Sequence, residues 1–139
     1  MTLRFNVMAG GIPAQPAAAI MGIVTSCSAT TSSGAPAGSN QATAALIPSD
    51  LVLLTGSATG SGTGYKLPAG TDAASPGNVN PGDTFEVVNQ GGNALLVYPN
   101  TASGKVQGGS AGAGFSVANN KTAWFTYLSG DLWGAVLSA

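Results

Sequence analysis

Residues 81–98 read PGDTFEVVNQGGNALLVY, and this stretch decides the fold class of the chain. Its Pro-Gly pair predicts a type II turn, because Pro presets φ at the first central position and Gly supplies the positive φ of the second. The residues that follow alternate between polar and apolar, which predicts a strand over residues 84–88. Since successive side chains of a strand point to opposite faces, Phe85 and Val87 should both point into a core.

A second strand is expected directly after this one. Residues 94–98 are apolar and rich in residues that favour strands, and Pro99 ends the segment because it lacks the amide hydrogen of a β-ladder. Residues 89–93, which include two glycines, separate the two strands. A loop of this length and glycine content predicts a β-hairpin.

Strand and turn patterns continue on both sides of this pair. Residues 51–54 form a continuous apolar run, which predicts a central strand covered on both faces. Further strands are expected at residues 115–117, 122–127 and 132–136, paired antiparallel through polar turns. Short strands at intervals of about ten residues predict an all-β domain with little helix, either an antiparallel β-sandwich or a small barrel of jelly-roll character.

Differences in composition and apolar pattern divide the chain into three zones. Residues 1–25 begin with an alternating segment, and we interpret them as a strand-like N-terminal arm. Residues 26–49 are dense in Ser, Thr, Ala and Gly, a composition that cannot bury enough surface to fold alone, so they predict a loop or linker. Residues 50–139 hold the strand and turn signals and are expected to form the β-sandwich domain.

Composition argues against catalysis. The 139 residues include no His, and Cys27 is the one Cys, which excludes a histidine proton carrier, an internal disulfide and a multi-cysteine zinc site. Asp83 and Glu86 are three residues apart, so a strand would place them on opposite faces rather than in one acid–base pair. The glycines of residues 60–64 lack the Lys-Ser or Lys-Thr pair of a phosphate-binding loop. We therefore expect no enzymatic activity, no cofactor and no metal.

Charge narrows the classes of partner. Four Lys and Arg against five Asp and Glu give a net charge of −1, so no strong field attracts nucleic acid. The apolar run at residues 17–24 is shorter than the roughly 20 residues that a bilayer requires, and Gly and Pro interrupt the segment before it. We expect neither nucleic acid nor a membrane as partner. With 6% charged residues, the surface suits contact with other protein.

Five segments carry a resemblance to a known family: residues 65–69, 81–89, 92–99, 114–127 and 132–133. Their turns and alternating apolar residues resemble those of small virion proteins of tailed bacteriophages, of the type that decorates or cements the capsid. The resemblance covers roughly residues 42–139. It implies a β-rich protein of the phage head, often a homotrimer, with related modules in fibres, and it brings no catalytic residues with it.

Resemblance and composition together favour a decoration protein on the outer capsid surface, synthesised in the cytoplasm of a bacterial host and then located in the virion. The expected partners are the major capsid protein and further copies of the chain, with a trimer favoured. A strand-like arm adds to an exposed sheet edge through backbone hydrogen bonds. We expect Leu3, Arg4, Phe5 and Val7 to make this contact with the capsid or a sister subunit.

Two other functions fit the same sequence. Aromatic rings stack on sugars, so Trp124 and Trp133, close to Tyr127, would form a platform for a bacterial surface glycan in a fibre or receptor-binding module. Strand alternation argues against this platform, because it places Trp124 on the face opposite Tyr127. Tryptophans in adjacent strands are also typical of a core or a subunit interface. The third hypothesis is a non-viral adhesin or surface-layer subunit.

Overall fold

The computed structural model describes residues 29–32, 38–47, 51–55, 63–70 and 79–139. These residues form ten strands and no helix, which confirms the all-β prediction. The strands are β1 (Ala29–Ser32), β2 (Ala45–Leu46), β3 (Leu51–Thr55), β4 (Gly64–Lys66), β5 (Thr84–Gln90), β6 (Leu95–Tyr98), β7 (Lys105–Val106), β8 (Phe115–Val117), β9 (Lys121–Ser129) and β10 (Leu132–Leu137).

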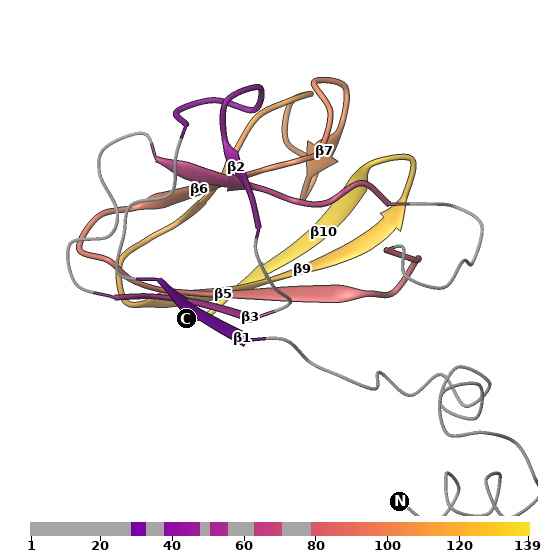
Figure 1. The fold of residues 1–139 in the computed structure, drawn as a ribbon. Helices are drawn as coiled ribbons and strands as arrows, with labels where there is room; N and C mark the ends of the chain where they lie inside the picture. Colours follow the sequence, from indigo (N-terminus) through magenta and orange to yellow (C-terminus); the bar gives the residue numbers. More distant parts are fainter. Residues whose placement is uncertain (1–28, 33–37, 48–50, 56–62, 71–78) are drawn as a thin grey trace, which may run out of the picture.

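The strands form two layers (Figure 1). One sheet has six strands in the order β1-β3-β5-β9-β10-β7, and the other has four in the order β2-β4-β6-β8. From β1 to β6 the chain alternates strictly between the two sheets, so odd-numbered strands lie in one and even-numbered strands in the other. Neighbours within each set are parallel. This part of the chain is therefore a two-layered parallel coil.

The second part of the chain closes the coil with antiparallel strands. β9 pairs with β5 in one sheet, and β8 pairs with β6 in the other. β10 then pairs antiparallel with β9, and the short β7 lies parallel to β10 at the sheet edge. The sheets are therefore mixed, and the expectation of an antiparallel jelly-roll arrangement is corrected in this respect. Among the described strands the sheets do not close into a barrel.

The predicted hairpin of residues 84–88 with 94–98 is wrong, although both strands exist. β5 and β6 lie in different sheets, and each has parallel neighbours from earlier in the chain. The reason is that each strand has an apolar inward face: Phe85 and Val87 on β5, and Leu95 and Val97 on β6. Placed in opposite layers, these faces cover each other, which hairpin pairing within one sheet would not achieve.

Asn89 fixes the crossover between these two strands. Its side chain is fully buried, and its Nδ2 donates to the carbonyl oxygens of Asn93 at 2.8 Å and Val117 at 2.8 Å. Its Oδ1 accepts a hydrogen bond from the Gly91 amide at 3.0 Å. Because a buried polar group is costly unless it is paired, this residue specifies where the chain leaves one sheet for the other.

The turn that begins β5 has the predicted form. The amide of Asp83 donates to the carbonyl of Asn80 at 3.0 Å, and Gly82 has a φ of 96°. The Asp83 carboxylate accepts the Asn80 amide at 2.7 Å, which closes the turn from the other side. The expected inward direction of Phe85 and Val87 is also confirmed, since both are buried.

The other predicted strands correspond to β3, β8, β9 and β10. β3 lies between β1 and β5 and is thus not an edge strand, as expected. The antiparallel hairpin of β9 with β10 is confirmed, and the positive φ angles of Gly130 and Asp131 form its turn. β8 and β9 do not pair with each other as predicted, because β8 belongs to the opposite sheet.

The zone predicted as a loop or linker, residues 26–49, contains β1 and β2. The composition of this zone indicates that it cannot fold by itself. Strand pairing, however, uses backbone groups that every sequence has, and here β3 and β4 supply the pairing partners. Ala44 and Ile47 of this zone are also buried. The predicted arm, residues 1–25, lies outside the described residues.

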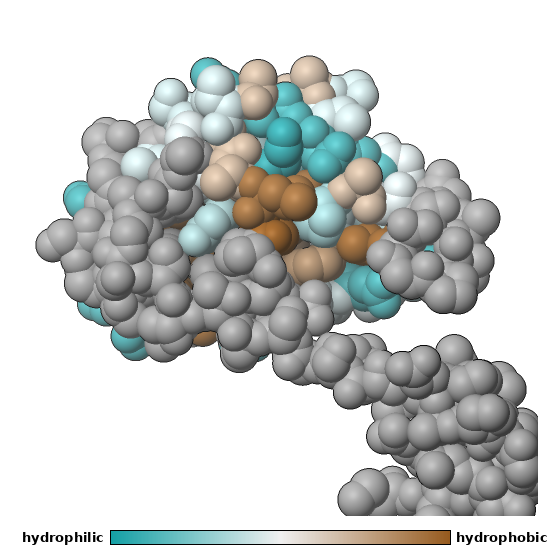
Figure 2. Space-filling view, viewed as in Figure 1, coloured by the Kyte–Doolittle hydropathy of each residue, from teal (hydrophilic) through white to brown (hydrophobic). Residues whose placement is uncertain are grey.

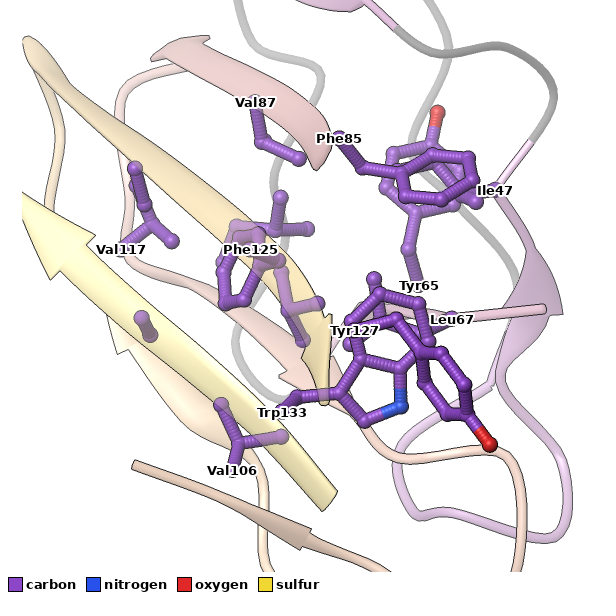
Figure 3. Packing of buried hydrophobic residues seen from close by; sticks show 14 residues of the cluster. Ile47, Tyr65, Leu67, Phe85, Val87, Val106, Val117, Phe125, Tyr127 and Trp133 are labelled. Carbon is purple, nitrogen blue, oxygen red and sulfur yellow. The ribbon is translucent and has the colours of Figure 1, made fainter. Parts of the chain in front are cut away.

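The core fills the space between the two sheets (Figure 3). In the view of Figure 2, hydrophobic side chains reach the surface at the centre, with hydrophilic ones around them. Trp133 lies at its centre, with ring centroids 5.8 Å from Phe85 and 5.1 Å from Tyr127, both in edge-to-face geometry. Phe115 and Phe125 form a further edge-to-face pair at 5.6 Å. Such pairs add about 0.5–1.5 kcal/mol each beyond the area they bury. Most of the large aromatic side chains therefore lie inside the domain. The outer faces of the sheets carry other residues.

Candidate interaction surface

The C-terminal hairpin of β9 and β10 has two contrasting faces. Its inward positions are buried in the core: Ala123, Phe125, Tyr127, Trp133 and Ala135. Alternation directs the intervening residues outward. We call these the outer hairpin face, which consists of Trp124, Thr126, Leu128, Leu132, Gly134 and Val136.

Four large apolar side chains of the outer hairpin face are exposed. The exposed fractions are 37% for Trp124, 52% for Leu128, 42% for Leu132 and 65% for Val136. They lie at the two ends of the face: Val136 is directly opposite Trp124 in the ladder, and Leu128 and Leu132 lie beside the turn. Scattered exposed apolar residues need no explanation, but four on one face of a hairpin indicate a contact with another molecule.

The middle of this face is small and uncharged. Gly134 is directly opposite Thr126, between the two apolar pairs. The hydroxyl of Thr126 is 3.1 Å from the hydroxyl of Thr84 on β5, so it already has a partner within the sheet. An approaching surface would therefore meet few polar groups to dehydrate at this point.

One charge of each sign borders the outer hairpin face. Glu86 on β5 is the direct neighbour of Trp124, and Lys105 on β7 is the direct neighbour of Leu132. Both side chains alternate with buried residues, Phe85 and Val87 around the one and Val106 beside the other, so both point outward. The carboxylate and the ammonium thus lie at diagonally opposite corners of the face.

Trp133 does not take part in this surface. Its side chain is 2% exposed, and its indole Nε1 donates to the Asp131 carboxylate at 3.0 Å (Figure 3 shows the ring beside Tyr127). Trp124 and Trp133 therefore lie on opposite faces of the hairpin. They do not form the shared glycan platform that the sequence suggested as an alternative, because a buried ring cannot stack on a sugar.

The Asp131 carboxylate joins the hairpin turn to the preceding loop. Its Oδ1 also accepts the amide of Asn100 at 3.2 Å, and its Oδ2 accepts the amide and hydroxyl of Thr101 at 2.6 and 2.7 Å. With the indole of Trp133, four donors converge on this one side chain. Sequence reasoning placed Asp131 in a turn but missed this role, although an Asp after Gly in a hairpin turn was the available signal.

The predicted contact residues Leu3, Arg4, Phe5 and Val7 lie outside the described residues. Within the part of the chain that the structure describes, no three His, Cys, Asp or Glu side chains gather in a way that could hold a metal ion. The described segments also contain no helix of the length and apolarity needed to cross a bilayer.

No protein-family model, curated protein or solved structure matches this chain. The strand predictions placed Trp124 on the face opposite Tyr127 but did not identify the outer hairpin face as a whole. Its signal was present in the sequence: Trp124, Leu128, Leu132 and Val136 are apolar at positions where a solvated sheet face carries polar residues.

Proposed function

We propose that this protein is a structural subunit of a bacteriophage particle that binds the outer surface of the capsid and stabilises the head. The observation that carries this proposal is the outer hairpin face: four exposed apolar side chains on a β-sheet, in a chain with very few charges. Such a surface is suited to contact with protein rather than to chemistry on a small substrate. The resemblance of residues 42–139 to decoration proteins is the reason for proposing a phage capsid as the partner.

Binding of this kind stabilises a shell by mass action. A subunit that binds only the assembled lattice lowers the free energy of the lattice and leaves free capsid protein unaffected. In this proposal the β-sandwich provides subunit contacts, and the N-terminal arm with Leu3, Arg4, Phe5 and Val7 reaches the major capsid protein. If several copies assemble, their arms bind the capsid together, and this combined binding is tighter than the weak binding of a single arm.

The decisive experiment measures the copy number of this chain relative to the major capsid protein in purified particles. Decoration predicts hundreds of copies per particle and heads that break at lower temperature when the protein is absent. A variant without residues 1–12 should leave shells undecorated while its β-sandwich still folds. Full occupancy by that variant would show that the arm is not the means of attachment.

A fibre or receptor-binding module remains the second candidate, favoured by the exposed ring of Trp124. In that case the chain should occur in few copies per particle, and Trp124→Ala should abolish binding of particles to host cells. Decoration instead predicts that Trp124→Ala leaves host binding unchanged. Absence of the chain from purified particles would reject both viral functions and leave the non-viral adhesin.

A further inference from the structure

We propose that the outer hairpin face binds the same face of a second copy of this chain across a two-fold axis, with Glu86 of each copy against Lys105 of the other. The inference does not depend on the capsid proposal, since it follows from the pattern of the face alone. An isologous contact requires a patch that is complementary to itself. The outer hairpin face has this property in charge, because Glu86 and Lys105 border it at opposite corners.

The positions of the two charges provide the main argument. Measured from the central pair Thr126 and Gly134, Glu86 is one strand beyond β9 and two residues along it. Lys105 is one strand beyond β10 and two residues along it in the opposite direction. With strands about 4.8 Å apart and about 6.8 Å between alternate residues, each charge lies about 7 Å sideways and about 7 Å lengthwise from the centre.

A two-fold axis in the plane of the interface exchanges these two charges, and because the sideways and lengthwise offsets are equal, the axis runs diagonally to the strands. It places the Glu86 position of one copy opposite the Lys105 position of its partner, twice per pair. The strands of the two copies then cross at nearly 90°, which is one of the two preferred geometries for packed sheets. The same axis places Trp124 of each copy beside Leu132 of the other.

The centre of the face permits this approach. Gly134 has no side chain, and a Cβ placed there would meet nothing closer than the Thr126 carbonyl at 3.9 Å. A second copy is preferred over a different protein because the face already contains both members of the charge pair that it needs. Glu86 and Lys105 cannot pair within one subunit, since β9 and β10 separate their strands.

The face is smaller than that of a typical permanent dimer, so we expect a dissociation constant in the micromolar range, on the order of 10 µM. The full chain should be studied by sedimentation velocity from about 1 to 200 µM, a range set by that expected constant. The expected result is a monomer–dimer equilibrium. The trimer that the phage resemblance implies has a different mass and is therefore distinguished directly.

Charge reversal tests the pairing itself. Glu86→Lys or Lys105→Glu alone places like charges opposite each other at two sites, and should weaken the dimer about 10-fold or more. The double variant Glu86→Lys with Lys105→Glu restores both contacts and should recover most of the affinity. A double variant no better than the single variants would show that these residues do not face each other.

A steric variant tests the face independently of charge. Gly134→Arg fits the folded monomer, where the space above Gly134 is open, but it fills the centre of the interface and should abolish the dimer. Leu46→Ser on β2 is the control, because Leu46 is 56% exposed but lies on the other sheet, so this change should leave the dimer intact. Circular dichroism and thermal unfolding check that each variant folds.

Four results would overturn the proposal: a monomer throughout the concentration range, a trimer, a dimer of unchanged affinity in Gly134→Arg, or a double charge-reversal variant that binds no better than the single variants.

Discussion

The two tryptophans of the C-terminal hairpin occupy opposite environments only nine residues apart in the chain. Trp133 is 2% exposed, packs against two aromatic rings and donates its indole N–H to Asp131. Trp124 is 37% exposed and lies beside Val136 on the outside. The same residue type therefore stabilises the fold at one position and is available for contact with another molecule at the other. Exposure, not residue type, separates the two roles.

Trp133→Ala should cause the largest loss of stability in this comparison. Removing a fully buried indole leaves a cavity between the sheets and costs about 3–5 kcal/mol in the free energy of unfolding. Urea unfolding followed by circular dichroism measures it. Trp133→Phe is the matched variant: it keeps an aromatic ring in the core but removes the donor to Asp131, and should lose less. Equal losses would mean that packing of the ring contributes little.

Asn89→Ala should be next in size, because the inside of this domain depends on one polar residue as well as on apolar packing. The change leaves the amide of Gly91 and the carbonyls of Asn93 and Val117 without their partner in a buried crossover, at a cost of about 2–3 kcal/mol. Chemical unfolding measures this loss. Gln90→Ala, at an exposed neighbour, is the control and should change stability little.

Asp131→Ala should lower stability by about 1–2 kcal/mol, because four hydrogen-bond donors lose their acceptor in a half-buried turn that water reaches in part. The intrinsic fluorescence of Trp133 should also change, since its N–H loses its partner. A variant that unfolds like the parent protein would show that water replaces the carboxylate fully.

Trp124→Ser should have the smallest effect on stability, within about 0.5 kcal/mol, as expected for an exposed surface position. Its effect should appear instead in self-association, where the variant loses the contact with Leu132 of the second copy. Unfolding at a concentration that keeps the protein monomeric separates the two effects. A loss of stability comparable to that of Trp133→Ala would contradict the distinction between the two faces.

Local features of this fold could be predicted from the sequence, and long-range features could not. The turn at residues 80–83, the inward direction of Phe85 and Val87 and the hairpin of β9 with β10 all depend on residues close in sequence. The pairing of β3 with β5 depends on strands separated by β4 and two loops. No rule of sequence spacing predicts that a strand skips its successor and pairs with the following strand. The predicted hairpin of residues 84–88 with 94–98 was wrong for this reason.

The candidate site divides in the same way. Alternation correctly separated Trp124 from Tyr127, but it could not show that Trp133 is buried, because that depends on β5 and on the turn at Asp131. Likewise, Lys105 and Leu132 are neighbours because β7 pairs parallel with β10, and no sequence pattern predicted this pairing. The charge pattern of the outer hairpin face is therefore a product of topology.

The alternation of β1 to β6 between the two sheets has a consequence for biosynthesis. The antiparallel strands that cover β5 and β6 come later in the chain, so the ribosome releases the whole parallel coil before β8 and β9. During that interval β5 and β6 are open edges with unpaired backbone groups, the condition in which nascent chains aggregate. Parallel pairing between distant strands is also slow. Recovery of soluble protein should therefore depend on translation speed through residues 99–121 and on the chaperones that hold the nascent chain.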